Sequence, residues 1–178
     1  MDRTASTPRG DSLQEVTIRR AGPADAGLVH DLILELAKSQ GLENRVRSSA
    51  QDIAREGFGE MPAFEALIAE RWGESVGLCL FFDSFSSWSG RRGVYVQDLY
   101  VADRARGLGL GRRLLANAAA IVQARGGSYL RLSVDADNAS AQDFYERVGL
   151  RPSATERIYQ ARDREFVDLA KSARAMGA

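Results

Sequence analysis

One stretch decides the fold of this chain, and it runs Arg106-Gly107-Leu108-Gly109-Leu110-Gly111-Arg112. Before it, residues 94–101 are rich in β-branched and aromatic side chains, which predicts a strand. After it, residues 112–125 carry one apolar face, which predicts a helix. Alternate glycines let a backbone approach a ligand closely, and the start of a helix offers unpaired N–H groups and a positive dipole end. The stretch therefore predicts an anion site, and the alternative is a flexible strand–helix connection without a ligand.

Outward from this stretch, strand and helix patterns alternate along the chain. Strands are expected at 16–18, 63–70, 75–82, 94–101, 129–134 and 158–161, with a hairpin turn at 71–74. Helices are expected at 23–40, 49–57, 112–125, 138–149 and 163–171. Strands separated by helices, with one hairpin among them, predict an α/β fold around a mixed sheet. We expect a disordered tail at 1–14, one domain at 15–172 and a short tail at 173–178.

Composition excludes several classes of function. Among 178 residues, 24 Lys and Arg balance 24 Asp and Glu, so no bulk positive field favours nucleic acid or a membrane surface. A single cysteine, Cys79, and a single histidine, His30, exclude a disulfide framework, a cysteine zinc site and HExxH chemistry, so no metal is expected. No apolar run approaches a membrane span, and residues 1–12 lack a signal peptide's apolar stretch. We expect a cytoplasmic protein.

Two common phosphate-binding motifs do not match the glycine stretch. A P-loop needs Gly-Lys-Ser/Thr, but Gly111 is followed by Arg112-Arg113. The dinucleotide fingerprint needs glycine three residues after Gly109, where Arg112 stands. Nucleotide hydrolysis and dinucleotide binding are therefore disfavoured.

The chain instead resembles the GNAT superfamily of acyl-CoA-dependent N-acetyltransferases. Arg106, Gly109 and Gly111 match its Arg/Gln-x-x-Gly-x-Gly/Ala signature, and residues 138–150 fit its Asn…Phe-Tyr…Gly pattern. Residues 18–25, 35–38, 56–60 and 97–101 resemble the spermidine/spermine branch, which includes enzymes acting on thialysine and other small amines. The resemblance implies an α/β GNAT fold, with a mixed central sheet of about six to seven strands that is splayed at the CoA site and flanked by helices. It also implies acetyl transfer from acetyl-CoA to a primary amine of a small molecule that is polyamine-, diamine- or lysine-like.

The same resemblance implies a set of acetyl-CoA-binding residues. They are Leu99, Tyr100, Val101, Arg106, Gly107, Leu108, Gly109, Leu110, Gly111, Arg112, Asn138 and Arg147. A backbone N–H near Leu99 is the expected donor to the oxyanion. Asn138 is expected both to cap its helix and to contact the pantetheine arm. Arg147 is expected at the CoA 3′-phosphate, and the alternative is an ordinary surface arginine.

The resemblance assigns the general acid to Tyr145, which would protonate the departing thiolate. The alternative is an aromatic side chain that only packs beside Phe144. Polyamine-acetylating relatives carry a glutamate where this chain has Gln97, and an amide cannot accept the proton of an ammonium group. The candidate base is Asp98 or a water molecule held by Gln97. The alternative role for Asp98 is structural, as the ion-pair partner of an arginine. His30 is expected to be structural.

Three neutral residues stand where polyamine enzymes tend to carry acids, namely Gln40, Ser86 and Gln97. Fewer carboxylates would bind a polycation poorly, so we expect a smaller, lysine-like acceptor. The aromatic segment 81–88 is expected to form one acceptor wall, or else a packing or dimer loop. Relatives form twofold dimers, so a homodimer using Tyr159 or Phe166 is expected. The alternatives are a peptide or protein N-acetyltransferase and a non-catalytic CoA-binding module.

Overall fold

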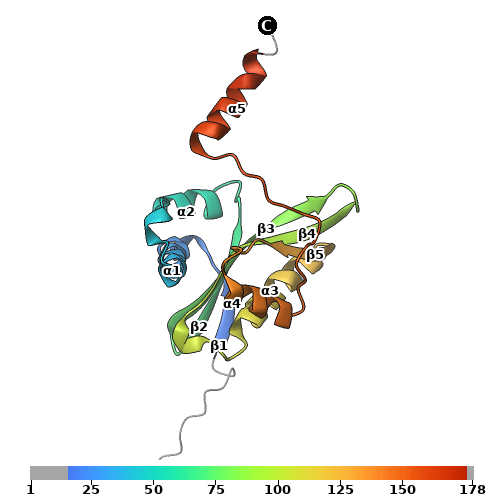
Figure 1. Cartoon of the computed structure of the whole chain (residues 1–178). Coiled ribbons are helices and arrows are strands. Elements are labelled where there is room, and N and C mark those ends of the chain that lie inside the picture. The colour runs from blue at the N-terminus through green and yellow to red at the C-terminus, as the bar shows by residue number, and fades with distance from the viewer. Residues whose placement is uncertain (1–15, 176–178) are drawn as a thin grey trace, which may run out of the picture. The chain divides into compact units, whose positions relative to one another are not determined.

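A five-stranded mixed sheet in the order β1-β2-β3-β4-β5 organises the first part of the chain. The computed structural model describes residues 16–175. Strands β1 (Val16–Arg20), β2 (Glu65–Arg71), β3 (Glu74–Ser86) and β4 (Arg91–Val101) are antiparallel in succession, and β5 (Gly127–Leu132) runs parallel to β4 (Figure 1). The chain divides into two compact units, one ending at Asp135 and one beginning at Ala136. The whole sheet belongs to the first unit.

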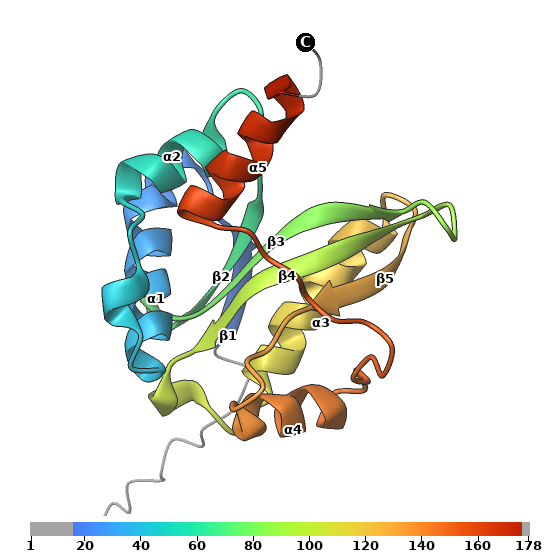
Figure 2. The same ribbon diagram turned by 45° about the horizontal axis from the view of Figure 1, so that its top comes forward.

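Helices cover both faces of this sheet. Helices α1 (Ala26–Ser39) and α2 (Ala50–Phe58) lie on one side, and α3 (Leu110–Gln123) lies on the other (Figure 2). Short 3₁₀ turns occur at Pro23–Asp25, Glu43–Arg45 and Asp103–Ala105. The layered α/β architecture predicted from the sequence is therefore confirmed.

Helix α3 is held against the sheet by an apolar face with helical spacing. Its buried side chains recur every three or four residues, and they are Leu110, Leu114, Leu115, Ala118 and Val122. Gly77 on β3 permits this close packing, because a Cβ there would lie 3.1 Å from a methyl carbon of Leu114 and 3.0 Å from the carbonyl oxygen of Tyr100. The packing fixes the start of α3, and with it the glycine loop, beside the end of β4.

The hairpin turn expected at 71–74 is present, with Trp72 (φ 54°) and Gly73 (φ 81°) both in the left-handed region. The second hairpin corrects an expectation. The strands were expected to end at residue 82 and to resume at residue 94, but the ladder continues through Ser84↔Gly93 and Ser86↔Arg91, and only the turn beyond Ser86 is irregular. Backbone pairing extends the strands although the side chains there are polar or exposed. Among these, Phe85 is 64% exposed and Trp88 fully exposed.

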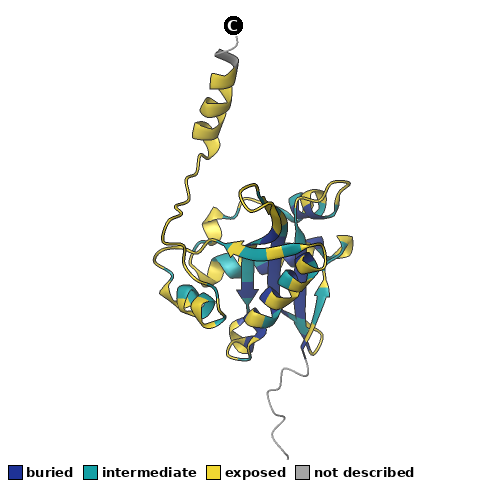
Figure 3. Cartoon of the chain, turned by 90° about the vertical axis from the view of Figure 1, so that its right-hand side faces the viewer, coloured by how far each residue is buried: buried dark blue, intermediate teal, exposed yellow. Residues whose placement is uncertain are grey.

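The second unit contains α4 (Ala139–Arg147) and α5 (Asp163–Ala175). The strand expected at 158–161 is wrong, because these residues are coil and pair with no described strand. Ile158 and Tyr159 are exposed, as is α5 throughout its described side chains (Figure 3). The described sheet thus has five strands where six to seven were expected. The tail expected at 1–14 lies outside the described residues. Of the tail expected at 173–178, residues 173–175 continue α5.

Candidate functional site

The pairing of β3 with β4 contains a bulge at Gln97. Leu80 pairs with Asp98, whereas the next residue, Phe81, pairs with Val96. Gln97 is therefore one extra residue on β4, and its side chain is exposed. A bulge re-aims the side chains around it and increases the local twist of the strand. Because of the extra residue, the side chain of Asp98 lies on the same face of the sheet as that of Tyr95, the partner of Phe82.

Beyond this bulge, one edge of β4 has no neighbouring strand. The pairing with β5 ends at Val96↔Leu132, but β4 continues to Val101. The N–H of Ala102 donates to the carbonyl oxygen of Val76 on the β3 side at 2.9 Å. In an antiparallel pair, alternate residues direct their backbone groups toward the partner strand. The backbone groups of Leu99 and Val101 therefore face away from β3. The expected opening of the sheet is present, and the N–H of Leu99 faces an edge that no described strand occupies.

The glycine loop follows this open edge directly. Gly107 (φ 78°) and Gly109 (φ 73°) adopt the left-handed conformation that glycine tolerates best. A Cβ on Gly107 would meet no atom within 4 Å, so its backbone is exposed. Gly109 is the N-cap of α3 and contributes no capping side chain. The N–H groups of residues 110–112 therefore have no intrahelical partner, and they coincide with the positive end of the helix dipole.

Two predicted phosphate-binding arginines flank this loop in different ways. Arg106 donates from Nε to the carbonyl oxygen of Val101 at 3.2 Å and pairs with Asp103 at 2.9 Å, so it braces the turn between β4 and α3. Arg112 is exposed in the first turn of α3. Leu108 is half-buried in the loop. Tyr100 is buried, and its hydroxyl has a raised pKa chiefly because of desolvation.

Asp98 is half-buried, and desolvation raises the pKa of its carboxyl group. Within residues 16–135 no arginine forms an ion pair with it, so no cation offsets the desolvation. The neighbouring thiol of Cys79 is buried, and desolvation together with the charge of Asp98 raises its pKa to about 12. Cys79 therefore stays protonated at neutral pH and is unsuited to act as a thiolate nucleophile.

The other predicted residues lie in the second unit. The Asn138 side chain accepts a hydrogen bond from the N–H of Ala141 at 3.1 Å, so the expected N-cap of α4 is present. Tyr145 is half-buried, and its ring meets that of Phe144 edge-on with centroids 5.3 Å apart. Arg147 is exposed in the last turn of the helix.

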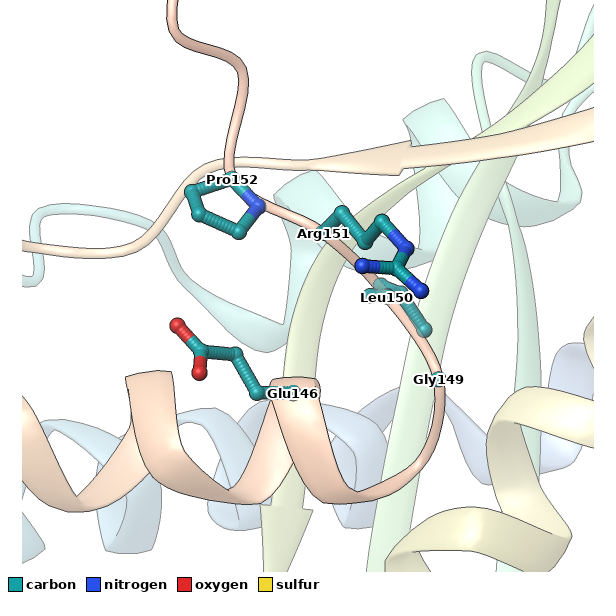
Figure 4. A pocket seen from close by; sticks show the side chains of 5 residues that line it. All are labelled: Glu146, Gly149, Leu150, Arg151 and Pro152. Carbon is teal, nitrogen blue, oxygen red and sulfur yellow. The ribbon is translucent and has the colours of Figure 1, made fainter.

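An open hollow of about 490 Å³ lies where α4 ends (Figure 4). Its lining residues are Glu146, Gly149, Leu150, Arg151 and Pro152. Gly149 ends the helix with a φ of 100°, and the carboxylate of Glu146 points toward Pro152 (Figure 4). Gly149 belongs to the pattern at residues 138–150, but none of the expected catalytic, acetyl-CoA-binding or acceptor-binding residues is among these five.

The three neutral residues expected at the acceptor site are not gathered in one place. Gln97 lies in the bulge, and Gln40 is exposed just after α1. Ser86 lies at the hairpin turn, where its Oγ accepts a hydrogen bond from the N–H of Ser89 at 3.3 Å. Its partner Arg91 precedes Gln97 by roughly 20 Å of strand, at about 3.3 Å per residue. The structure therefore separates Ser86 from Gln97.

Sequence reasoning missed a polar and aromatic face on β3, β4 and β5. The Phe82 and Tyr95 rings stack with centroids 5.1 Å apart, and the Tyr95 hydroxyl lies 2.5 Å from Oγ of Ser133. On the same face, Ser84 Oγ donates to the Tyr129 hydroxyl at 3.1 Å. The alternation of residues 129–133 could have indicated one shared face. The bulge that places Asp98 on this face has no signal in the sequence.

Comparison with known proteins identifies the family. Residues 30–150 match the Acetyltransferase (GNAT) family. The chain belongs to this family. GNAT enzymes are acyl-CoA-dependent N-acetyltransferases, and acetyl-CoA is their cosubstrate.

Relatives of known activity refine the comparison within the GNAT family. A thialysine N-epsilon-acetyltransferase of Bos taurus is 37% identical over 142 residues, which cover 75% of this chain and 83% of the relative. The Sus scrofa protein of the same name is 35% identical over 78% of this chain and 86% of its own length. An integron cassette protein from the mobile metagenome of V. cholerae shares the fold, with a TM-score of 0.74, 23% identity and coverage of 88% of this chain and 98% of that one.

Three observations complete the description of this GNAT domain. His30 contacts the carbonyl oxygen of Ser48 through Nε2 at 2.8 Å, which links α1 to the segment before α2 and fits the expected structural role. No helix within residues 16–175 is long and apolar enough to cross a membrane. In the same residues, no three His, Cys, Asp or Glu side chains are grouped as a metal site would require.

The environment of Asp98 predicts how stability depends on pH. Its pKa in the folded chain lies above the ordinary value of 3.8, so the folded chain binds this proton more tightly than the unfolded chain does. The stability that this proton provides is complete below pH 3.8 and is lost as the pH rises through the folded pKa. Asp98→Asn should therefore raise the Tm at pH 7 to 8, and the gain should vanish near pH 4.

Thermal unfolding of both proteins over this pH range measures the effect. Asp31→Asn is the matched control, because it removes an exposed carboxylate of α1 and should change the Tm little. A lower Tm of Asp98→Asn at pH 7 would contradict the account and would place Asp98 in a stabilising ion pair.

Proposed function

We propose that this chain transfers an acetyl group from acetyl-CoA to a primary amine of a small, lysine-like molecule. The observation that carries the proposal is the open edge of β4 directly before an uncapped helix N-terminus, both in the first unit. An extended amide chain ending in a diphosphate needs such a pairing edge followed by an anion site. The thialysine activity of the mammalian relatives supports an acceptor of lysine-like shape.

The described residues fit acetyl-CoA in this arrangement. The pantetheine arm would pair with the outward-facing carbonyl group of Leu99 and the outward-facing backbone groups of Val101. The diphosphate would lie at the N–H groups of residues 107–112, where the exposed backbone of Gly107 leaves room for it. The exposed guanidinium of Arg112 would add a charge-assisted contact. Asn138 and Arg147 keep the pantetheine and 3′-phosphate roles that the family resemblance gives them.

Each chemical step then has a group of this chain to support it. The amine attacks the thioester carbonyl, so a C–N bond forms and the oxygen becomes negative. The N–H of Leu99 would stabilise this oxyanion, because it is fixed in the sheet and faces the open edge. The carbonyl then re-forms, the C–S bond breaks, and the Tyr145 hydroxyl would protonate the thiolate, while the proton that the amide nitrogen loses would restore the hydroxyl. Because the buried Cys79 thiol has a raised pKa, it would not form an acyl-enzyme, and we propose that the transfer is direct.

The proton of the incoming ammonium group would pass to Asp98. A primary amine has a pKa near 10, so it must lose a proton before it can attack. The raised pKa of Asp98 makes it a stronger base than an exposed aspartate. The exposed amide of Gln97 in the bulge would hold a water between the ammonium group and this carboxylate. Gln97 thus serves as a positioning residue.

The glycine loop gives a test of the cosubstrate site. Gly107→Ala places a Cβ on a residue with a φ of 78°, which costs about 1–2 kcal/mol and shifts the loop away from this conformation. We expect the Kd for CoA to rise roughly tenfold in isothermal calorimetry. Gly126→Ala is the matched control, because Gly126 has a φ of 86° and equally open surroundings but follows the opposite end of α3. Equal affinity of the two variants would contradict the proposed diphosphate site.

The acid role of Tyr145 is tested by removing its hydroxyl. Tyr145→Phe should lower turnover at least tenfold in a thiol-release assay with a library of amines, while the Kd for CoA stays near that of the wild type. Asp143→Asn is the control, since Asp143 is an exposed residue of the same helix, α4, with no proposed role in the reaction. Unchanged turnover in Tyr145→Phe would assign this ring to packing against Phe144 alone.

A twofold dimer is the assembly that we propose for this enzyme. Apolar side chains of α5 are exposed, with Phe166 62% and Leu169 65% accessible, and Tyr159 precedes them on the exposed coil. A second chain would cover this surface. Sedimentation equilibrium at micromolar concentration should give twice the chain mass of 19.4 kDa, and a single monomeric species would refute the dimer.

A further inference from the structure

We propose that Arg131 binds the carboxylate of an amino-acid acceptor, and so selects amino acids over plain diamines. The inference rests on the proposed function, because it concerns the acceptor of that reaction. Arg131 pairs in register with Tyr95 on β4, one position before the last pair of the two strands. Its side chain is exposed, at the point where the sheet opens.

The guanidinium of Arg131 lies on the polar and aromatic face of the sheet. Its central carbon is 5.6 Å from the centroid of the Tyr129 ring, so the two side chains share one face of β5. The Tyr129 ring fills the space that a Cβ on Gly93 would need, at 2.4 Å. Its hydroxyl accepts the hydrogen bond from Ser84. The ring under Arg131 is therefore fixed by β3 and β4.

The bulge brings Arg131 and the proposed base to the same face. Tyr95, the partner of Arg131, lies on the face of Asp98 only because Gln97 is an extra residue. Tyr95 and Asp98 are three positions apart, about 10 Å along β4 at roughly 3.3 Å per residue, and Arg131 lies about 5 Å across on the neighbouring strand. Arg131 and Asp98 are therefore about 11 Å apart along the sheet, and side chains on one face at this spacing can contact the carboxylate and the reacting amine of a molecule as long as lysine.

The charges at the two ends of this span differ in sign. Asp98 would meet the ammonium group that reacts, and Arg131 would meet the far end of the acceptor. A carboxylate at that end forms charge-assisted hydrogen bonds with the planar guanidinium. A second ammonium group, as in a diamine or polyamine, is instead repelled. The arrangement therefore selects by attraction of one acceptor class and repulsion of the other.

The test compares thialysine with bis(2-aminoethyl) sulfide, the diamine that lacks only the carboxylate. Wild-type enzyme should show a kcat/KM for thialysine at least tenfold above that for the diamine. Arg131→Gln should lower the thialysine value at least tenfold through KM, and Arg131→Glu should raise the diamine value. Arg92→Gln is the matched control. Arg92 is an exposed arginine of β4 that pairs with Phe85. It lies two positions before Val94, so its side chain is on the face of the sheet opposite to that of Tyr95 and Arg131.

The outcomes separate the two proposals. The carboxylate role of Arg131 would be overturned if the wild type had equal kcat/KM values for both amines. It would also be overturned if Arg131→Gln lowered kcat/KM equally for both. Acetyl transfer itself would stand in either case. An equal effect of Arg92→Gln and Arg131→Gln on thialysine would also overturn the carboxylate role, since general surface charge would then explain both. A failure of the wild type to release thiol with any amine would instead refute the proposed function.

Discussion

The functional part of this fold depends on the loss of pairing between β4 and β5 after Val96. A parallel pair that continued to Val101 would use every backbone group of β4, and no edge would face a ligand. The extra residue at Gln97 changes the twist of β4 at this same point. Helix α3 then begins beside the strand end, because its buried leucines and the absence of a side chain at Gly77 hold it close to the sheet. The open edge and the uncapped helix N-terminus therefore follow each other directly along the chain.

The same interruption explains the unusual position of Asp98. A carboxylate in a regular, buried ladder would be paired or replaced, since desolvation disfavours its charged form. Here it is half-buried without a cation among residues 16–135, and its pKa is raised. A group that lowers the stability of the folded chain at neutral pH is a candidate for chemistry rather than for packing. Its neighbour Cys79 experiences the same desolvation and is inert for that reason.

The sequence predicted much of this arrangement, and its failures have physical causes. The strand before the glycine loop, α3, the hairpin at Trp72–Gly73 and the cap at Asn138 follow from local patterns, because propensity, apolar spacing and turn chemistry act within a few residues. The bulge depends on the register of two strands, which no local pattern encodes. The strand expected at 158–161 failed because a strand also needs an edge to pair with. Ser86 was grouped with Gln97 by its position relative to polyamine enzymes, and the register of β3 and β4, which places it beside Arg91, is not visible in the sequence.

The polar and aromatic face around Tyr95 and Tyr129 shows what the structure adds to the family assignment. Membership in the GNAT family establishes acetyl-CoA as cosubstrate, but the family does not fix the acceptor. We propose that the acceptor is selected by side chains on three strands, which the bulge and the absence of a Cβ at Gly93 bring together.

Backbone amide exchange, followed by NMR with and without acetyl-CoA, measures the central claim directly. The account predicts that acetyl-CoA slows exchange of the amides of Leu99 and of the first turn of α3, while those of β1 and β2 stay unchanged. Protection confined to other parts of the chain, or no protection at all, would contradict it.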